Sequence, residues 1–554
     1  MEHGTAAAVA VTLLLVVATT HFLTGRTRSN DEADDVPSMP PFWFPVLGHW
    51  PEMKWSPDSF LARLNKRYPE GIFSLNLVGS IHTFVARPSL ITQLVDLPEA
   101  VATSDMIRMR LMYSNFGLRK GDSEELVRKV DELDAILCAP GELDRMMDTT
   151  VRTLNRNIAD WVTFNSQPAD QMEWEEVAGA DVVEDGLGEN VVEVDLKELT
   201  MAFVARVTTP SIFGTDFCDN FPDFTQHLWR LEQHFALLAS NLSAGVPYRG
   251  LQLARGARRK LLAYLEEYHT ELEKAASGED NDPKWDNLDN VSSYMKARQA
   301  LFRKEGASIR VRAALDLRVL WAVNANSAPL IFWMLYEINR DPVLVEQIRD
   351  EIAPYMDVVQ PKNDFGLAVW MAPEMRNVDM DGLMEKCPLL KGSCLETLRL
   401  YTAFDTIKCL KEDAVLGKPF DARGRGGYLL RKGTFAHATY ELHQLDPVAY
   451  PEPHEWQPSR HFKYNADGGG DRRRLAPMPH PLVDKSNTST GHNLTEREVM
   501  LFTAAILSMY DIQPAAGLRW ESQKLFKTTS TKHPSRSVKA WIRRREVRQE
   551  TAGA

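Results

Sequence analysis

Three segments that follow one another between Lys391 and Met500 constrain the fold of this 554-residue chain most strongly. In the first, Glu396 and Arg399 stand three residues apart in a helix-like run, so both side chains share one helix face. A carboxylate and a guanidinium placed in this way can form a bidentate hydrogen-bonded pair. Arg460, near the end of the second segment, can reach back to Glu396. We therefore expect Glu396, Arg399 and Arg460 to form a buried charge network that supports the fold.

The second and third segments differ in the structure that they predict. Tyr450–Phe462 is aromatic and too rich in proline for a helix or a central strand, so it is expected to meander. Gly491–Met500 begins an apolar helix that runs to Tyr510, and the triplet Thr488-Ser489-Thr490 stands directly before it.

The order of the three segments resembles the cytochrome P450 superfamily. In that family an E-x-x-R helix precedes a P-x-x-W/F-x-P-x-R-F meander, a haem-binding loop and a further helix. The meander of this chain departs from the pattern only where His461 precedes Phe462. The resemblance covers nearly the whole chain. It implies a mainly α fold with small β-sheets, one large domain over residues 46–554, a haem cofactor, and electrons from an external flavin reductase.

The haem loop departs from the family pattern F-x-x-G-x-x-x-C-x-G, whose cysteine thiolate binds the iron. Alignment of Gly491 with the second glycine places Ser489 at the cysteine position and His492 at the basic residue that often follows. Alignment with the first glycine places Thr495 at that position instead, and neither alignment supplies a thiolate. The resemblance thus assigns the metal-ligand position to Ser489. His492 and the nearby His480 are further cofactor-binding candidates, because imidazole is a common axial ligand.

The cysteines and the charge of the chain exclude several other classes. All five cysteines precede Arg460, so a small shift of the alignment brings none of them into the loop: Cys138, Cys218, Cys387, Cys394 and Cys409. Their spacing indicates neither a zinc site nor a disulfide framework, and a reducing compartment is the simpler interpretation. A net charge of -12 argues against a nucleic-acid partner.

The N-terminus predicts a membrane anchor over residues 1–28. Thr5–Leu23 has no acidic residue and no lysine or arginine, and its length suffices for a helix of about 28 Å. Arg26 and Arg28 follow this run, so the positive-inside rule places the rest of the chain in the cytosol. We expect a single-pass protein of the endoplasmic reticulum membrane. The alternative, a cleaved signal peptide, lacks a basic start and a clear cleavage site.

Residues 29–45 form an acidic and then proline-rich linker, expected to be stiff and extended. Its aromatic triplet, Phe42-Trp43-Phe44, fits either the core or a membrane interface. Beyond it, alternating apolar residues predict a helix at 58–67, a hairpin with strands at 72–77 and 83–86, and a helix at 89–97. The acidic or polar stretches 166–190 and 275–290 are expected to be exposed loops.

The longest helical pattern, Arg310–Arg340, contains the catalytic candidates Asn324, Asn326 and Ser327. These polar residues interrupt an apolar helix, and Pro329 should bend it at the same place. In the resembling family this helix crosses the oxygen-binding face of the haem, where an acid and a threonine deliver protons; here the acid is absent. The local sequence is most similar to the branch with prostacyclin synthase and the bile-acid sterol hydroxylases. The alternative is that the asparagines only satisfy a kinked backbone.

Three functional hypotheses follow. The first is a membrane-bound haem monooxygenase that oxidises a lipophilic terpenoid, sterol or polyketide, as in secondary metabolite biosynthesis, despite the missing thiolate. The second is a haem-independent isomerase or cyclase that uses Asn324, Asn326 or Ser327 to orient its substrate. The third is a non-catalytic binding protein that retains the fold. Family precedent favours the first hypothesis, and loss of the thiolate favours the second.

Overall fold

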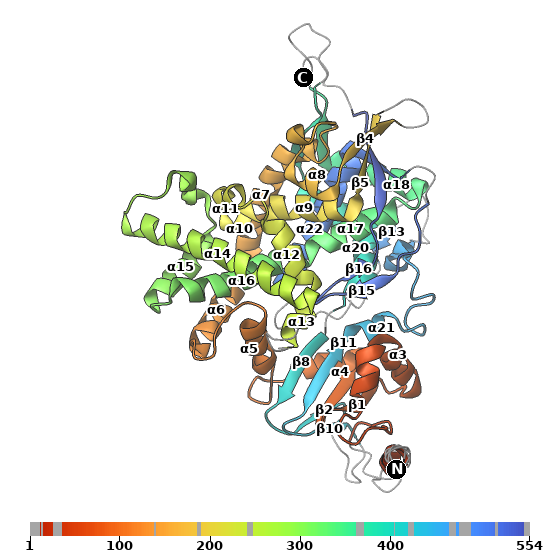
Figure 1. The fold of residues 1–554 in the computed structure, drawn as a ribbon. Coiled ribbons are helices and arrows are strands. Elements are labelled where there is room, and N and C mark those ends of the chain that lie inside the picture. The colour runs from red at the N-terminus through yellow and green to blue at the C-terminus, as the bar shows by residue number, and fades with distance from the viewer. Residues whose placement is uncertain are drawn as a thin grey trace, which may run out of the picture. The chain divides into compact units, whose positions relative to one another are not determined.

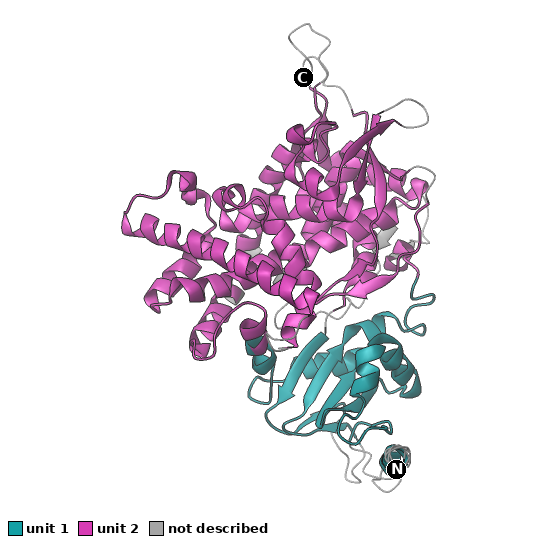
Figure 2. Ribbon diagram, viewed as in Figure 1, with its two compact units in different colours: residues 1–109, 404–454, 479–488 teal, residues 110–403, 455–478, 489–554 magenta. Residues whose placement is uncertain are grey.

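The computed structural model describes most of the chain and divides it into two compact units (Figure 2). The described residues are 12, 15–25, 36–137, 140–184, 190–240, 248–361, 371–403, 405–418, 426–464, 473–475, 489–515 and 519–547. Side chains are described throughout these ranges except at 135–137, 140, 462–464, 473–475 and 489–493. Unit 1 comprises residues 1–109, 404–454 and 479–488; unit 2 comprises residues 110–403, 455–478 and 489–554.

Unit 1 is built on a five-stranded sheet with the strand order β1-β2-β11-β8-β3. Strands β1 (Ile72–Leu77) and β2 (Ser80–Val85) form an antiparallel hairpin, and β11 (Phe435–Thr439) pairs in parallel with β2. Strands β8 (Asp405–Leu410) and β3 (Ala102–Thr103) complete the sheet. The first predicted strand is confirmed. The second begins three residues before its predicted start, because Val78 and Gly79 both adopt positive φ and close a two-residue turn.

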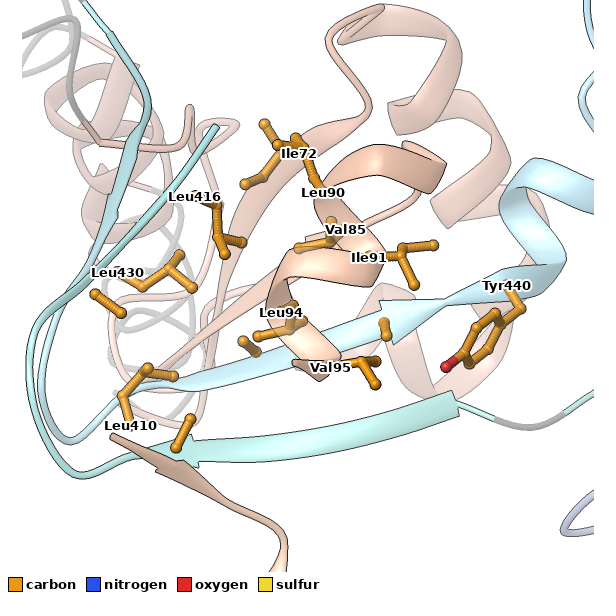
Figure 3. Packing of buried hydrophobic residues seen from close by; sticks show 14 residues of the cluster. Ile72, Val85, Leu90, Ile91, Leu94, Val95, Leu410, Leu416, Leu430 and Tyr440 are labelled. Atoms are coloured by element: carbon orange, nitrogen blue, oxygen red, sulfur yellow. The ribbon is translucent and has the colours of Figure 1, made fainter. Parts of the chain in front are cut away.

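Helices cover this sheet and supply the core of unit 1. Helix α4 (Pro88–Val95) places its apolar residues against buried side chains of the sheet, as Figure 3 shows. A second buried cluster joins α3 (Pro57–Arg67) to the phenylalanines of the β1–β2 hairpin. Both helices lie where the sequence predicts them. The unit also contains α2 (Trp50–Trp55), α21 (Tyr440–Gln444) and the strand pair β9 (Ala414–Leu416) and β10 (Tyr428–Leu430).

Unit 2 is mainly helical (Figure 1). Helix α5 (Asp105–Ser114) crosses the boundary in sequence between unit 1, which ends at Met109, and unit 2, which begins at Arg110. The helices of unit 2 are α6 Glu124–Leu137, α7 Pro140–Asn157, α8 Glu173–Ala178, α9 Leu196–Thr208, α10 Pro210–Phe213, α11 Thr215–Asn220, α12 Phe224–Gln233, α13 Phe235–Ala239, α14 Arg249–Ser277, α15 Ser293–Lys304, α16 Ile309–Ala325, α17 Ser327–Ile338, α18 Pro342–Ile352, α19 Met380–Lys386, α20 Pro388–Tyr401 and α22 Ser489–Met509.

The strands of unit 2 form small sheets. A four-stranded antiparallel sheet has the order β14-β17-β5-β4, from β14 (Tyr510–Pro514), β17 (Lys539–Arg544), β5 (Asn190–Asp195) and β4 (Asp181–Glu184). Two-stranded pairs complete the unit: β6 Met356–Val359 with β7 Glu374–Val378, β12 Phe462–Tyr464 with β13 Arg473–Leu475, and β15 Leu525–Lys527 with β16 Lys532–Pro534. The predicted fold class, mainly α with small β-sheets, is confirmed.

The expectation of an exposed loop at residues 166–190 is wrong. This stretch contains α8 and β4, and Trp174 of α8 is buried. The buried Glu175 carboxylate accepts hydrogen bonds from the backbone N–H groups of Met172 and Thr163, so it fixes the start of α8. The stretch 275–290 also contains more structure than predicted, since α14 runs to Ser277 and short 3-10 helices follow.

Two apolar helical stretches bear on the predicted membrane anchor. The stretch 309–338 is long and apolar enough to cross a membrane, but it is mostly buried and forms the centre of unit 2. Its second half, α17, is buried at every residue and packs against α9, α20 and α22. Leu15–Gly25 is a shorter apolar helix. It covers the second half of the predicted Thr5–Leu23 run, whose first residues lie outside the described part of the chain.

Candidate functional site

The central helix of unit 2 is broken where the sequence predicts a bend. Helix α16 ends at Ala325 and α17 begins at Ser327, with Asn326 between them at φ -100° and ψ -57°. Pro329 explains the break, because it lacks the N–H that would bond to the carbonyl of Ala325 and its ring crowds that carbonyl. The break places the three polar candidates at one position along the helix axis.

Asn324 is buried and all of its amide contacts lie within the protein. Its Nδ2 donates to the Leu320 carbonyl at 2.9 Å and to the Thr209 hydroxyl at 3.2 Å. Its Oδ1 accepts from the Thr208 hydroxyl at 3.4 Å. Asn324 therefore ties α16 to the junction between α9 and α10.

Asn326 differs from Asn324 in its surroundings. Its side chain is half-buried, and its described hydrogen bond, from Nδ2 to the Ala322 carbonyl, is 3.5 Å long. At that length the bond is weak. The Asn326 amide is therefore held less firmly by its described contacts than the Asn324 amide.

Ser327 is buried and donates a hydrogen bond to the Oε2 atom of Glu498 on α22. Glu498 is also buried, and burial raises the pKa of its carboxyl to about 7, while the hydrogen bond from Ser327 acts in the opposite direction. A carboxyl with such a pKa gains and loses a proton near neutral pH. The sequence did not mark Glu498 as functional. Its one signal was that, with Ser489 aligned to the cysteine position, Thr495 and Glu498 fit an A-x-x-E pattern that follows the haem loop in the resembling family.

A cluster of aromatic side chains surrounds Trp321, which lies one helical turn before the break in α16. Trp321 stacks on Phe235 with ring centroids 4.9 Å apart, and Phe116 lies 5.7 Å from the same indole. The Trp321 Nε1 group donates to the buried Glu232 carboxylate, which also accepts from the Thr529 hydroxyl at 2.8 Å. This arrangement connects α12, α16 and the turn between β15 and β16.

Glu396, Arg399 and Arg460 come together in unit 2. Arg399 bonds the fully buried Glu396 carboxylate with two nitrogens, at 2.9 and 2.8 Å, and Arg460 reaches it at 3.2 Å. His461 adds a hydrogen bond at 2.9 Å. Burial opposes ionisation, yet the hydrogen bonds from Arg399 and His461 hold the pKa of Glu396 at about 2. His461, the one departure in the meander, was missed as a member of this network.

The ligand candidates lie at the limit of the described residues. Ser489 is the first residue of α22, and the side chains of Ser489 and His492 are outside the described set, as is all of His480. Thr495 is half-buried within α22.

The residues present do not fit the family's thiolate-bound haem. The described cysteines lie elsewhere in the fold, Cys218 on α11, Cys387 and Cys394 at the start of and within α20, and Cys409 on β8. Burial raises the pKa of the Cys394 thiol well above its usual value, so this group remains a thiol. No group of three or more metal-binding side chains occurs among the residues that the structure describes. Because the sequence also contains no cysteine after Cys409, we derive no reaction step through a thiolate-bound iron.

Comparisons with known proteins agree with the arrangement of the segments. A family model described as Cytochrome P450 matches residues 163–479, which is more than half of the chain and ends ahead of Ser489. A cytochrome P450 monooxygenase of Gibberella zeae is 21% identical over 93% of this chain and 88% of its own length. Cytochrome P450 7B1 of Mus musculus is 24% identical over 91% and 89%. A 25-hydroxycholesterol 7-alpha-hydroxylase of Rattus norvegicus is 24% identical over 56% and 70%.

Proposed function

The chain belongs to the cytochrome P450 family, and on this premise we propose that it is a membrane-bound enzyme that oxidises a lipophilic small molecule. A terpenoid, a sterol or a polyketide of secondary metabolism is the substrate class proposed. Relatives support this class, since one of them is named as a hydroxylase of 25-hydroxycholesterol. A separate flavin reductase would supply electrons. Residues 1–28 would anchor the enzyme in the endoplasmic reticulum membrane, with residues 46–554 in the cytosol.

The proposal rests on one hydrogen bond. It joins Ser327, the first residue of α17 after the helix break, to Glu498 of α22. A buried hydroxyl joined to a carboxyl with a pKa of about 7 can hold a proton and release it at neutral pH. In this chain Glu498, on a different helix, would replace the acid that the family carries beside its threonine. We assign proton transfer to Ser327 and Glu498, substrate orientation to Asn326, and positioning of α16 to Asn324.

This chain differs from the family pattern at the position of the iron ligand, because its sequence contains no cysteine after Cys409. We propose Ser489 as the residue at the ligand position, with His480 and His492 as alternatives. A serine hydroxyl is a poor iron ligand at neutral pH, because it must first lose a proton with a very high pKa. Oxidation by this chain would therefore need an iron centre unlike that of its relatives.

A haem-independent isomerase or cyclase is the second candidate function, and one specific observation favours it. The sequence contains no cysteine after Cys409, while Glu498 and Ser327 together offer an acid and a base that need no metal. General acid–base catalysis by a carboxyl with a pKa near the working pH contributes roughly 100- to 10,000-fold to a rate. Both candidate functions use Ser327 and Glu498, and they differ in the mass of the product.

The mass of the product separates the two functions. The purified membrane protein is incubated with a panel of sterols and terpenoids, with and without a flavin reductase and its reduced nucleotide, and the products are analysed by mass spectrometry. A product heavier by one oxygen atom, formed only with the reductase, supports oxidation. A product of unchanged mass, formed without the reductase, supports the isomerase. Glu498→Gln should abolish either product, and the exposed Glu279→Gln serves as its control. A fully active Glu498→Gln would contradict the proposal.

A further inference from the structure

A pocket of about 500 Å³ in unit 2 is lined by residues of α8, α9, α12 and the strand pair β15–β16. Helix α9 packs against both α8 and α12. Thr529, in the turn between β15 and β16, donates to the Glu232 carboxylate of α12 from its hydroxyl at 2.8 Å and from its backbone N–H at 3.4 Å. These bonds hold the turn against α12. Sites for small molecules have volumes of roughly 300 to 1,000 Å³, so this pocket has a suitable size.

The pocket is lined by three acidic and three basic side chains, Asp195, Glu198, Glu232, Lys197, Arg230 and Arg536. Each acidic group already has a partner. The Asp195 carboxylate accepts from the backbone N–H groups of Lys197 and Glu198 at 3.0 and 3.1 Å. The Glu198 carboxylate pairs with the Lys197 ammonium at 2.6 Å. Since Glu232 is bonded as described above, none of the three carboxylates of the pocket lacks a donor.

Arg230 on α12 and Arg536, which follows β16, differ from the other charged residues of the pocket. Both are exposed, and neither forms an ion pair or a side-chain hydrogen bond with any residue that the structure describes. His533 also lines the pocket, but burial lowers its pKa to about 3, so its ring is neutral at neutral pH. The pocket therefore has two unpaired positive charges. A guanidinium binds a carboxylate through two parallel charge-assisted hydrogen bonds.

Apolar side chains form another part of the lining. Met201 of α9 is buried, while Trp229 of α12, Phe526 of β15 and Val177 of α8 are half-buried. A small inorganic anion would pair with the arginines and leave these side chains uncovered. A neutral lipophilic molecule would cover them and leave both arginines unpaired. The ligand class that meets both requirements is a lipophilic molecule with one acidic group.

We propose that this pocket binds a lipophilic carboxylic acid, whose carboxylate contacts Arg230 and Arg536 and whose hydrocarbon part packs against the apolar lining. The site goes beyond the function proposed above, because it requires neither a haem nor the proton transfer by Ser327 and Glu498. Its ligand is recognised by charge and apolar contact together, so an uncharged analogue of the same acid should bind weakly.

Photoaffinity labelling of the full-length protein tests the site. The protein is reconstituted into nanodiscs of phosphatidylcholine and irradiated at neutral pH with a decanoic acid that carries a diazirine, or with the corresponding alcohol. Mass spectrometry of the peptides locates the labelled residues. One double variant, Arg230→Gln with Arg536→Gln, removes both charges, and a second, Arg230→Lys with Arg536→Lys, keeps them. Arg259→Gln is the matched control, since Arg259 is an exposed arginine of α14 outside the pocket.

We expect the acid to label peptides that contain Met201, Trp229 or Phe526, and unlabelled decanoic acid to compete with this labelling. The double glutamine variant should bind the acid about tenfold more weakly or worse, because two charge-assisted hydrogen bonds are lost. The double lysine variant should retain most of the labelling, and Arg259→Gln should retain all of it. Because Arg230 and Arg536 are exposed, every variant should keep the melting temperature of the parent.

Three results would overturn the proposal. The first is equal labelling of the pocket by the acid and the alcohol, which would show that the charge is not recognised. The second is unchanged labelling in the double glutamine variant. The third is labelling that unlabelled decanoic acid does not reduce, or that it reduces only in peptides outside the pocket.

Discussion

At the scale of single residues, the proton transfer that we propose depends on the buried carboxyl of Glu498, whose pKa is raised by burial. Burial raises the pKa of Glu498 from 4.5 to about 7. The unfolded chain releases the proton near pH 4.5, while the folded chain keeps it up to about pH 7. The folded state therefore binds more protons between these values, and its stability falls as the pH rises through them. Above pH 7 the loss is constant.

We predict that Glu498→Gln removes this pH dependence. A glutamine has similar size and no charge to bury, so the variant should gain stability over the parent as the pH rises from 4.5 to 7. The gain should reach roughly 3 kcal/mol, which corresponds to the raised pKa at about 1.4 kcal/mol per unit. Thermal unfolding of both proteins over this pH range measures it. Parallel curves for parent and variant would show that Glu498 titrates normally.

Glu396 illustrates the opposite case, a buried carboxylate that stays charged because cations surround it. We predict that Glu396→Ala strands Arg399 and Arg460 and lowers the free energy of unfolding by roughly 3 to 5 kcal/mol. The loss should appear whether or not haem is bound, since we propose a structural role for this network. Chemical denaturation measures it, with the exposed Glu279→Ala as the control. A Glu396→Ala protein as stable as the control would refute that role.

At the scale of helices and strands, Asn324 lies within α16 and Asn326 lies at the break before α17, although the two asparagines look equivalent in the sequence. We predict that Asn324→Ala costs roughly 1 to 3 kcal/mol of stability, because the buried hydroxyls of Thr208 and Thr209 lose a partner. Asn326→Ala should change stability by less than about 0.5 kcal/mol and lower substrate turnover instead, because its amide has only a weak internal contact. Denaturation curves and turnover for both variants check this pair. The reverse pattern would show that Asn326 is structural and Asn324 catalytic.

Elements that depend on local signals could be predicted from the sequence, and those that depend on distant partners could not. Pro329 fixes the helix break and alternating apolar residues fix the β1 strand, so both were predicted. Strand β4 is held by β5, which pairs in turn with β17 more than 300 residues later, and an acidic stretch gives no sign of such a partner. The pairing of Ser327 with Glu498 has the same origin, because it depends on the packing of α17 against α22.

At the scale of the whole molecule, the chain keeps the family's architecture, while its sequence contains no cysteine after Cys409. The mainly helical fold, the Glu396 network and the central helix are all present. The loop that would carry the ligand lies outside the described residues, so its chemistry rests on the sequence alone. We propose that no cysteine thiolate reaches the iron site.

The absorbance spectrum of the reduced, carbon-monoxide-treated protein shows whether a thiolate binds the iron. Full-length parent protein and the variants Ser489→Cys, His480→Ala and His492→Ala are purified, and the haem content of each is measured beside its spectrum. We predict no thiolate-type band in the parent and the appearance of such a band in Ser489→Cys, because a cysteine there restores a soft anionic ligand. A thiolate-type band in the parent would show that a cysteine does bind the iron.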